Sequence, residues 1–296
     1  MISVVIPAFN EEGAIGNTIN EVIKVFKDAN ITPYEVVIVN DGSTDNTAAE
    51  ALASGATVIS NPHNMGYGYS LKRGITIAKY DTIAITDADM TYPFEYIPEF
   101  IKEKERGVDL VIGERTGKHY RESFFKAILR RILKFFVEFT ADRRINDINS
   151  GLRVFSRITV MEYFDRLCDT FSFSTSQTLA YMMNSKFVTY IPIPYNKRKG
   201  KSKVKLFKDS VRTLQYIVEA SVYYNPLKIF TLFSFVCIFL SVIGFIVSTT
   251  RGIQAGYLLG IGGMIVALFF IGIGLLAVLL KKIMDRSGGQ NGKTNK

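Results

Sequence analysis

Two long stretches without a charged residue, near the carboxyl end, constrain this chain more than any other feature. They run from Ile229 to Ser248 and from Tyr257 to Leu280. A helix of roughly 20 apolar residues is long enough to span the hydrocarbon core of a bilayer, which is about 30 Å thick. The alternative is a pair of buried core helices, which two such runs in tandem disfavour. The pattern therefore predicts a transmembrane helical hairpin.

The charged residues that flank the hairpin predict its orientation. Lys228 precedes the first stretch, Lys281 and Lys282 follow the second, and the connecting segment carries only Arg251. Cytoplasmic flanks carry the excess of Lys and Arg, so both ends of the hairpin are expected in the cytosol. The chain starts directly in strand-like residues, which leaves no room for a secretory signal. We expect an integral protein of the cytoplasmic membrane with its large amino-terminal domain in the cytosol.

Net charge and cysteine content narrow the partners. The formal net charge is +9, and eight basic residues but one acidic residue lie between Lys197 and Arg212, just before the hairpin. Basic residues at that place favour contact with anionic headgroups or a phosphorylated lipid. Nucleic acid is not expected, because the recognised binding motifs are missing from the sequence. No disulfide is expected either, since Cys237 lies in the hairpin and Cys168 outside it.

Short runs rich in Val and Ile alternate with helical patterns over the first part of the chain. The expected strands are Ser3–Phe9, Tyr34–Asn40, Thr57–Ser60, Thr82–Thr86 and Leu110–Gly113. This alternation predicts an α/β fold with a mostly parallel sheet flanked by helices. In such sheets, ligands bind beyond the carboxyl ends of the strands.

Two segments, Arg121–Thr140 and Lys205–Tyr224, have the apolar spacing of amphipathic helices. Basic amphipathic helices commonly lie in the membrane interface, and packing against the large domain is the alternative. The expected organisation is a cytosolic domain, a juxtamembrane amphipathic helix, the hairpin and a cytosolic tail, over residues 1–205, 206–226, 227–281 and 282–296.

Asp87 and Asp89 stand one residue apart where the fourth predicted strand ends. In an extended strand, alternate side chains point the same way, so the two carboxylates would share one face. One interpretation is a polar strand end with solvated carboxylates. The other is a divalent-metal site, because hard cations such as Mg²⁺ and Mn²⁺ prefer carboxylate oxygens.

Three motifs carry a family resemblance: "VIPAFNEE" from residue 5, "VNDGSTDNT" from residue 39 and "DADMTYP" from residue 87. Together they resemble the family 2 glycosyltransferases of GT-A-type fold. The later motifs "IGER", "NDINSGLRVF" and "KRKGKSK", followed by the hairpin, are similar to the polyprenyl-phosphate branch, which includes the dolichol-phosphate mannose synthases.

The resemblance implies a site for a nucleoside-diphosphate sugar along the first half of the sheet. Glu11 would bond the ribose hydroxyls and Asp41 would read the base. For Gly66, close approach to the nucleotide competes with a plain turn. The implied donor-binding residues are Pro7, Phe9, Glu11, Asp41, Gly66, Asp87, Arg198, Ser202 and Lys203.

The resemblance also implies that Asp87 and Asp89 hold a divalent cation, Mg²⁺ or Mn²⁺, against the donor diphosphate. Many relatives of the mannose synthase type carry Gln two residues after the second Asp, where this chain has Thr91. A hydroxyl can also ligate Mg²⁺, so Thr91 is the third candidate ligand.

The acceptor end depends on arginines. Arg115 matches an arginine that contacts the lipid phosphate in the polyprenyl-phosphate branch, with Arg121 and Arg131 as candidates for a second contact. Arg153 matches a further motif, near Asp147, Ser150 and Gly151. Asp89, Arg115 and Arg153 are thus the candidate catalytic residues.

The resemblance predicts a membrane-bound enzyme that moves a hexose onto dolichyl or undecaprenyl phosphate, with inversion. A phosphate monoester has a second pKa of about 6 and needs no general base near neutral pH. The chain has no tryptophan, so it lacks the Gln-x-x-Arg-Trp motif of processive synthases. Two alternatives stay open: transfer to a lipid or saccharide hydroxyl, suggested by Ser174 and Gln177 where many relatives place an acid, and a non-catalytic membrane scaffold. The sequence also leaves open whether the chain forms a homo-oligomer.

Overall fold

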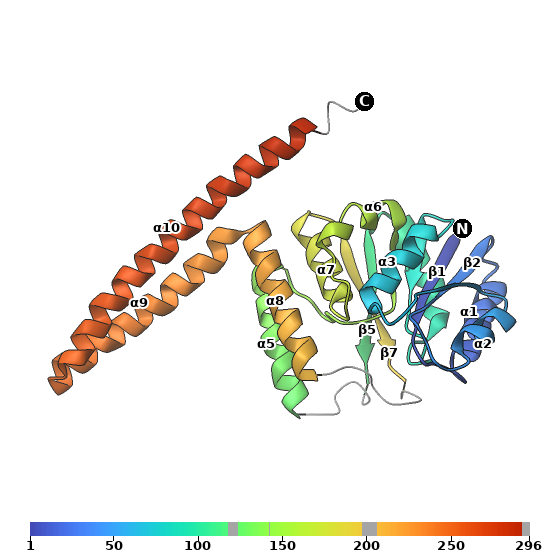
Figure 1. Ribbon diagram of the computed structural model, residues 1–296, viewed down its shortest axis with the longest axis horizontal. Helices are drawn as coiled ribbons and strands as arrows, with labels where there is room; N and C mark the ends of the chain where they lie inside the picture. The colour runs from blue at the N-terminus through green and yellow to red at the C-terminus, as the bar shows by residue number, and fades with distance from the viewer. Residues whose placement is uncertain (118–123, 142, 197–205, 292–296) are drawn as a thin grey trace. The chain divides into compact units, whose positions relative to one another are not determined.

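The computed structural model describes residues 1–117, 124–141, 143–196 and 206–291. The chain divides into two compact units, Met1–Tyr216 and Ile217–Lys296. The first unit is built around a sheet whose strand order is β3-β2-β1-β4-β6-β5-β7 (Figure 1). The strands are β1 Ile2–Ala8, β2 Tyr34–Asn40, β3 Thr57–Ser60, β4 Thr82–Ile85, β5 Leu110–Thr116, β6 Arg153–Ser156 and β7 Val188–Pro194.

All neighbouring strands of this sheet run parallel except β6, which is antiparallel to both β4 and β5. The expected mostly parallel, helix-flanked sheet is therefore confirmed. The described helices are α1 Ile15–Asp28, α2 Thr47–Ala53, α3 Tyr67–Ile77, α4 Ile97–Glu105, α5 Phe124–Ala141, α6 Arg157–Met161, α7 Phe173–Met183, α8 Leu206–Tyr224, α9 Pro226–Arg251 and α10 Gln254–Asn291.

Both faces of the sheet are covered by helices. Successive strand residues point to opposite faces, so each buried strand contributes side chains to both layers of the core. Val4 and Ile6 of β1 pack with Ile19 of α1 and Phe100 of α4 on one face. Val5, between them, packs on the other face in a cluster formed with α3, α6 and α7. Strands covered on both sides read as continuous apolar runs, which is why β1, β2 and β4 were recognisable in the sequence.

Two strands of the described sheet, β6 and β7, were not expected. The four residues of β6 begin with an arginine, and β7 contains Pro192 and Pro194. Proline cannot donate to a sheet ladder and is normally confined to edge strands. The position of β7 at the end of the strand order satisfies that requirement.

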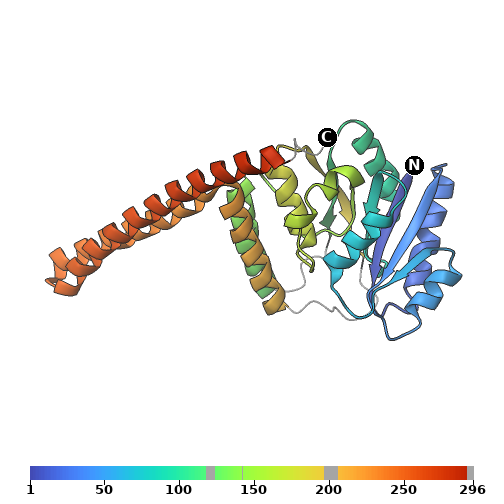
Figure 2. The ribbon, with the colours of Figure 1, turned by 45° about the horizontal axis from the view of Figure 1, so that its top comes forward.

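The second unit contains α9 and α10, which lie side by side and antiparallel (Figures 1 and 2). They are long and apolar enough to cross a membrane. Small residues permit their close contact: a Cβ added to Gly244 would lie 2.8 Å from the Gly256 carbonyl oxygen. The helices turn at Gly252, whose φ of 63° suits glycine.

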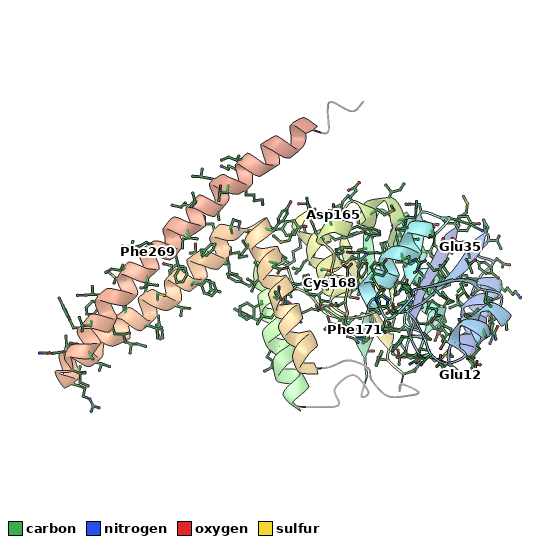
Figure 3. All side chains as sticks on the ribbon, in the orientation of Figure 1. Glu12, Glu35, Asp165, Cys168, Phe171 and Phe269 are labelled. Carbon is green, nitrogen blue, oxygen red and sulfur yellow. The ribbon has the colours of Figure 1, made fainter. Side chains whose placement is uncertain are left out.

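Many of the described apolar side chains of α9 and α10 are exposed, and Phe269, labelled in Figure 3, is one of them. Its exposed fraction is 67%. Only 22% and 11% of the residues in their most hydrophobic windows are buried. A pair of buried core helices would show the opposite pattern. The exposed apolar surface therefore agrees with the predicted hairpin.

Candidate active site at the carboxyl edge of the sheet

The predicted site residues converge because of strand direction. The parallel strands β1, β2, β4 and β5 end at one edge of the sheet, so the segments that hold Glu11, Asp41, Asp87 and Arg115 meet there. β6 runs the other way and therefore starts at this edge. Its first residue, Arg153, pairs with Ile85 of β4 and with Ile112 of β5.

Asp87 and Asp89 lie beyond the end of β4, in a bend and not in an extended strand. The strand ends at Ile85, and Met90 has a φ of 61°. The expectation that strand pleating would set the two carboxylates on one face is therefore wrong for this segment. Asp89 is only 2% exposed, whereas Asp87 is half-buried.

Thr91 orients the Asp89 carboxylate. Its hydroxyl donates to Asp89 Oδ1 at 2.6 Å, and its backbone N–H points to the same oxygen at 3.2 Å. Thr91 is itself fully buried. In this structure, Thr91, the third candidate metal ligand, therefore acts as a hydrogen-bond donor to the Asp89 carboxylate.

Two tyrosines lie near Asp87, the half-buried Tyr67 and the buried Tyr92. Tyr67 donates to Asp87 Oδ1 at 3.1 Å, and the Tyr92 hydroxyl oxygen accepts from the Gly151 N–H at 2.7 Å. A Cβ on Gly151 would lie 2.9 Å from Asp87 Oδ1, so a larger residue would push against the carboxylate. Burial and the nearby Asp87 charge raise the pKa of Tyr67 well above its usual value. Tyr67 therefore stays protonated and remains a donor.

Arg115 forms a bidentate ion pair with Asp147. Arg115 Nε and Nη2 lie 2.7 Å and 2.8 Å from the two carboxylate oxygens, and the guanidinium also lies 5.4 Å from the centre of the Tyr195 ring. The side chains are 14% and 1% exposed. Burial alone would raise the pKa of Asp147, but the Arg115 charge and the hydrogen bonds outweigh burial and hold that pKa below its usual value.

Arg153 is fully buried under the site. Its guanidinium donates to the backbone oxygens of Ser150 and Ile148 and to the side chains of Gln177 and Thr178. Burial lowers its pKa from the usual value. These contacts tie the 148–153 loop, which carries Gly151, to α7. In this structure Arg153 thus holds in place the loop that packs against Asp87.

The Asp41 carboxylate holds the turn that leads into α3. It accepts from Asn61 Nδ2 at 2.7 Å and from the backbone N–H groups of Met65 and Gly66 at 2.8 and 3.0 Å. Gly66 has a φ of 109°, and a Cβ there would lie 2.7 Å from the Asp169 carbonyl oxygen. Both residues therefore have a structural role besides the donor contacts that the resemblance implies.

Glu11, Pro7 and Phe9 are half-buried where β1 leads into α1. The backbone N–H of Glu11 donates to the Thr47 hydroxyl at 2.8 Å, which ties this loop to the start of α2. Arg131 is exposed on α5. Arg121, Arg198, Ser202 and Lys203 lie outside the described residues.

The carboxylate oxygens at this edge of the sheet suit a magnesium-like ion. Within residues 1–117, 124–141, 143–196 and 206–291, no cluster of three or more His, Cys, Asp and Glu side chains is placed to hold a metal. Mg²⁺ commonly binds through one or two carboxylates together with substrate phosphates and water. Asp87 and Asp89 meet that requirement, and no larger protein cage is needed.

Residues that sequence reasoning did not place in the site include Tyr67, Tyr92 and Tyr195. Tyr92 lies in the "DADMTYP" motif, Tyr195 lies just before "KRKGKSK", and Tyr67 directly follows Gly66, but nothing in the sequence distinguishes them from core aromatics. Asp147 was noted only as a neighbour of the Arg153 motif, and its pairing with Arg115 spans 32 residues of chain.

Comparison with known proteins gives one family match and several relatives. The family model described as "Glycosyl transferase family 2" matches residues 3–164. A hexosyltransferase of low-salt glycan biosynthesis from Haloferax volcanii is 30% identical, over 90% of this chain and 65% of its own length. The chain therefore spans less than two thirds of that relative.

Two further relatives are covered more fully. An undecaprenyl-phosphate 4-deoxy-4-formamido-L-arabinose transferase from Serratia proteamaculans is 26% identical, over 95% of this chain and 89% of its own. A dolichyl-phosphate hexose transferase from Haloferax volcanii is 28% identical, over 70% and 87%.

Among solved structures, the fold resembles glucosyl-3-phosphoglycerate synthase from Mycobacterium tuberculosis, crystallised with Mn²⁺, uridine diphosphate and glucosyl-3-phosphoglycerate. The TM-score is 0.59 at 20% identity, covering 75% of this chain and 80% of that one. At this identity the likeness shows the fold alone.

Proposed function

Because this chain belongs to glycosyl transferase family 2, we propose that it transfers a hexose from a nucleoside-diphosphate sugar to a polyprenyl phosphate. The family resemblance read from the motifs is confirmed by the family match. The polyprenyl-phosphate branch is supported by relatives named as undecaprenyl-phosphate and dolichyl-phosphate transferases. The proposed acceptor is therefore dolichyl or undecaprenyl phosphate, and the proposed reaction inverts the anomeric carbon.

The observation that carries the proposal is the meeting of two kinds of charge at one sheet edge. The carboxylates of Asp87 and Asp89 follow β4, and the Arg115 guanidinium projects from β5, two strands away in the order β4-β6-β5. Carboxylates suit a cation on a diphosphate, and a planar guanidinium suits a phosphate. Such a site can hold an anionic donor and an anionic acceptor side by side.

Asp87 and Asp89 would hold the divalent cation, with Thr91 keeping the Asp89 carboxylate in place. Bound there, the cation would stabilise the negative charge of the leaving nucleoside diphosphate. Arg115 would position the acceptor phosphate, and its ion pair with Asp147 would keep the guanidinium plane in one orientation. Arg153 would support the loop that closes against Asp87.

A phosphate acceptor also suits the protonation states of the site. A general base works best when its pKa lies near the operating pH. The ion pair with Arg115 holds the pKa of Asp147 below its usual value, which makes that carboxylate a poor base. Ser174 and Gln177, which stand where many relatives place an acid, are both buried, and neither an alcohol hydroxyl nor an amide serves as a general base near neutral pH. A phosphate dianion attacks without a base, whereas a hydroxyl would need one.

The test is a transfer assay with matched acceptors. Purified full-length protein would be incubated with radiolabelled UDP- and GDP-linked hexoses, Mn²⁺ or Mg²⁺, and either polyprenyl phosphate or the corresponding polyprenol. We expect labelled lipid with the phosphate and not with the alcohol. Transfer to the polyprenol would favour the hydroxyl acceptor, and no transfer from any donor would favour the scaffold.

The proposed location is the cytoplasmic membrane, with the site in the cytosol, and it predicts a labelling pattern. Gln254 lies at the start of α10 and Asn291 at its end. Gln254→Cys should react with an impermeant thiol reagent from outside intact cells, and Asn291→Cys should not. The reason is that the basic residues flank the two ends of the hairpin that are expected in the cytosol, and not the connection between its helices.

The parent chain is the control, since it carries Cys168 and Cys237. Labelling at 291 but not at 254 would invert the orientation. The site would then face away from cytosolic nucleotide sugars.

A further inference from the structure

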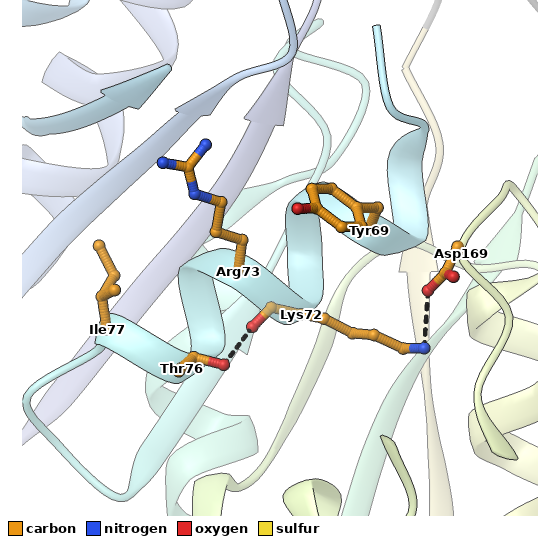
Figure 4. Close-up of a pocket in the computed structure, with 6 residues that line it drawn as sticks. All are labelled: Tyr69, Lys72, Arg73, Thr76, Ile77 and Asp169. Atoms are coloured by element: carbon orange, nitrogen blue, oxygen red, sulfur yellow. Dashed lines mark hydrogen bonds and ion pairs between the residues drawn. The ribbon is translucent and has the colours of Figure 1, made fainter. Parts of the chain in front are cut away.

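The start of α3 and the segment 167–171 are held together by polar contacts. The Tyr69 N–H donates to the Asp169 carbonyl oxygen at 2.9 Å. Lys72 Nζ contacts the Leu167 carbonyl oxygen at 2.6 Å and Asp169 Oδ1 at 2.7 Å. Figure 4 shows the ion pair between Lys72 and Asp169. One helix turn is therefore joined to one loop by three polar contacts.

Two glycines allow this contact to be so close. A Cβ on Gly68 would lie 2.1 Å from the Cys168 carbonyl oxygen, and a Cβ on Gly66 would lie 2.7 Å from that of Asp169. Both clashes would be with backbone, which cannot rotate away as a side chain can. These two glycines therefore let the backbone of residues 168 and 169 lie directly against the start of α3.

Phe171 stacks on Tyr67. Their ring centres are 5.6 Å apart and their planes differ by 16°. Phe171, labelled in Figure 3, is 44% exposed, so its ring shields Tyr67 while part of its own surface meets solvent. Offset aromatic stacks of this kind stabilise the position of both rings.

Tyr67 in turn reaches Asp87, through the hydrogen bond to Oδ1 described above. The outer torsion of an aspartate side chain has a broad energy profile, so the carboxylate plane needs partners to be fixed. Tyr67 supplies one of these partners, and Gly151 closes on the same oxygens.

We infer that Tyr67 is a positioning residue for the Asp87 carboxylate, and that Phe171 holds Tyr67 in place for this purpose. The inference rests on the proposed function, in that Asp87 is taken to bind the divalent cation. Partners that hydrogen-bond a ligating carboxylate orient it, and their loss typically weakens metal binding about 10- to 100-fold. Neither tyrosine nor phenylalanine would touch the cation itself.

The experiment measures Mn²⁺ binding directly, by the loss of the free Mn²⁺ signal in electron paramagnetic resonance. Full-length protein in detergent would be titrated in the presence of UDP or GDP. Tyr67→Phe removes one hydroxyl and should raise the Kd for Mn²⁺ about tenfold or more. Tyr69→Phe is the matched control, because Tyr69 is an exposed tyrosine on the same helix that lines the surface hollow of Figure 4. Its Kd should equal that of the wild type.

The outcomes separate the inference from the function on which it rests. If the wild type binds Mn²⁺ and Tyr67→Phe binds it with the same Kd, the inference is overturned and the proposed function stands. Absence of Mn²⁺ binding in the wild type overturns both. If Tyr67→Phe does not fold, Phe171→Leu replaces it, since this change removes the stacked ring at a half-exposed position. A raised Kd in that variant supports the inference, and an unchanged Kd overturns it.

Discussion

Asp89→Ala should abolish hexose transfer, because the donor diphosphate would lose the cation that Asp89 is proposed to hold. A metal that stabilises transition-state charge contributes several kcal/mol, and each 1.36 kcal/mol corresponds to a tenfold change in rate. We therefore expect a loss of roughly a thousandfold or more. The measurement is the transfer rate at saturating Mn²⁺ and donor.

The structure shows that alanine alone is an ambiguous test. Asp89 is buried and accepts both the hydroxyl and the N–H of Thr91, so its removal leaves two buried donors without that acceptor. An unsatisfied buried donor costs about 1–3 kcal/mol of stability. Asp89→Asn is the matched variant, because its amide oxygen can still accept from Thr91 while the negative charge is gone. Near wild-type transfer by Asp89→Asn would refute the metal site.

Arg115→Ala should impair use of the lipid phosphate while sparing the donor. Losing a hydrogen bond to a charged group costs about 1.5–3 kcal/mol, or roughly 10- to 100-fold in affinity. We expect the KM for polyprenyl phosphate to rise, kcat to fall, or both. Donor affinity, titrated with metal and without lipid, should stay within a few fold of the wild type. A collapse of donor binding with normal acceptor dependence would assign Arg115 to the diphosphate.

The ion pair with Asp147 adds a stability effect that must be separated from binding. Removing Arg115 leaves a carboxylate that is 1% exposed without its charged partner. Breaking a buried pair in this way costs about 3–5 kcal/mol. The double variant Arg115→Ala/Asp147→Asn removes the stranded charge, so it should unfold at a higher temperature than Arg115→Ala. Its acceptor affinity should remain low, because the phosphate contact is still missing.

Arg115→Lys separates charge from geometry. Lysine keeps the positive charge but cannot make the planar two-point contact with Asp147. We expect it to keep part of the stability and to bind the acceptor less well than arginine. Equal performance of lysine and arginine would mean that charge alone matters at this position.

Much of the large domain was predictable because its signals are local. The apolar runs of β1, β2 and β4 are properties of consecutive residues, and the structure places these strands within about one residue of the expectation. The carboxyl-edge location of Glu11, Asp41, Asp87 and Arg115 followed from strand direction in a parallel sheet. β6 escaped notice because four residues that start with a buried arginine carry little periodicity.

The roles of single residues were less predictable than their location. Arg153 and Asp41 were identified from motifs, but a motif does not report burial. The structure shows Arg153 with no exposed surface and Asp41 accepting three protein hydrogen bonds. Only the packing of α7 and of the 61–66 turn around them produces those environments.

The sequence by itself determined the hairpin and the acidic pair, since hydropathy adds up along consecutive residues and a motif is read at fixed spacing. The tertiary structure alone decided what holds each charge in place. Tyr67 meets Asp87 across 20 residues of chain, and Arg115 meets Asp147 across 32. Such partners are chosen by how helices and loops pack over the sheet edge, where a carboxylate that loses contact with water must find other donors. That choice depends on three-dimensional proximity, which no stretch of consecutive residues encodes.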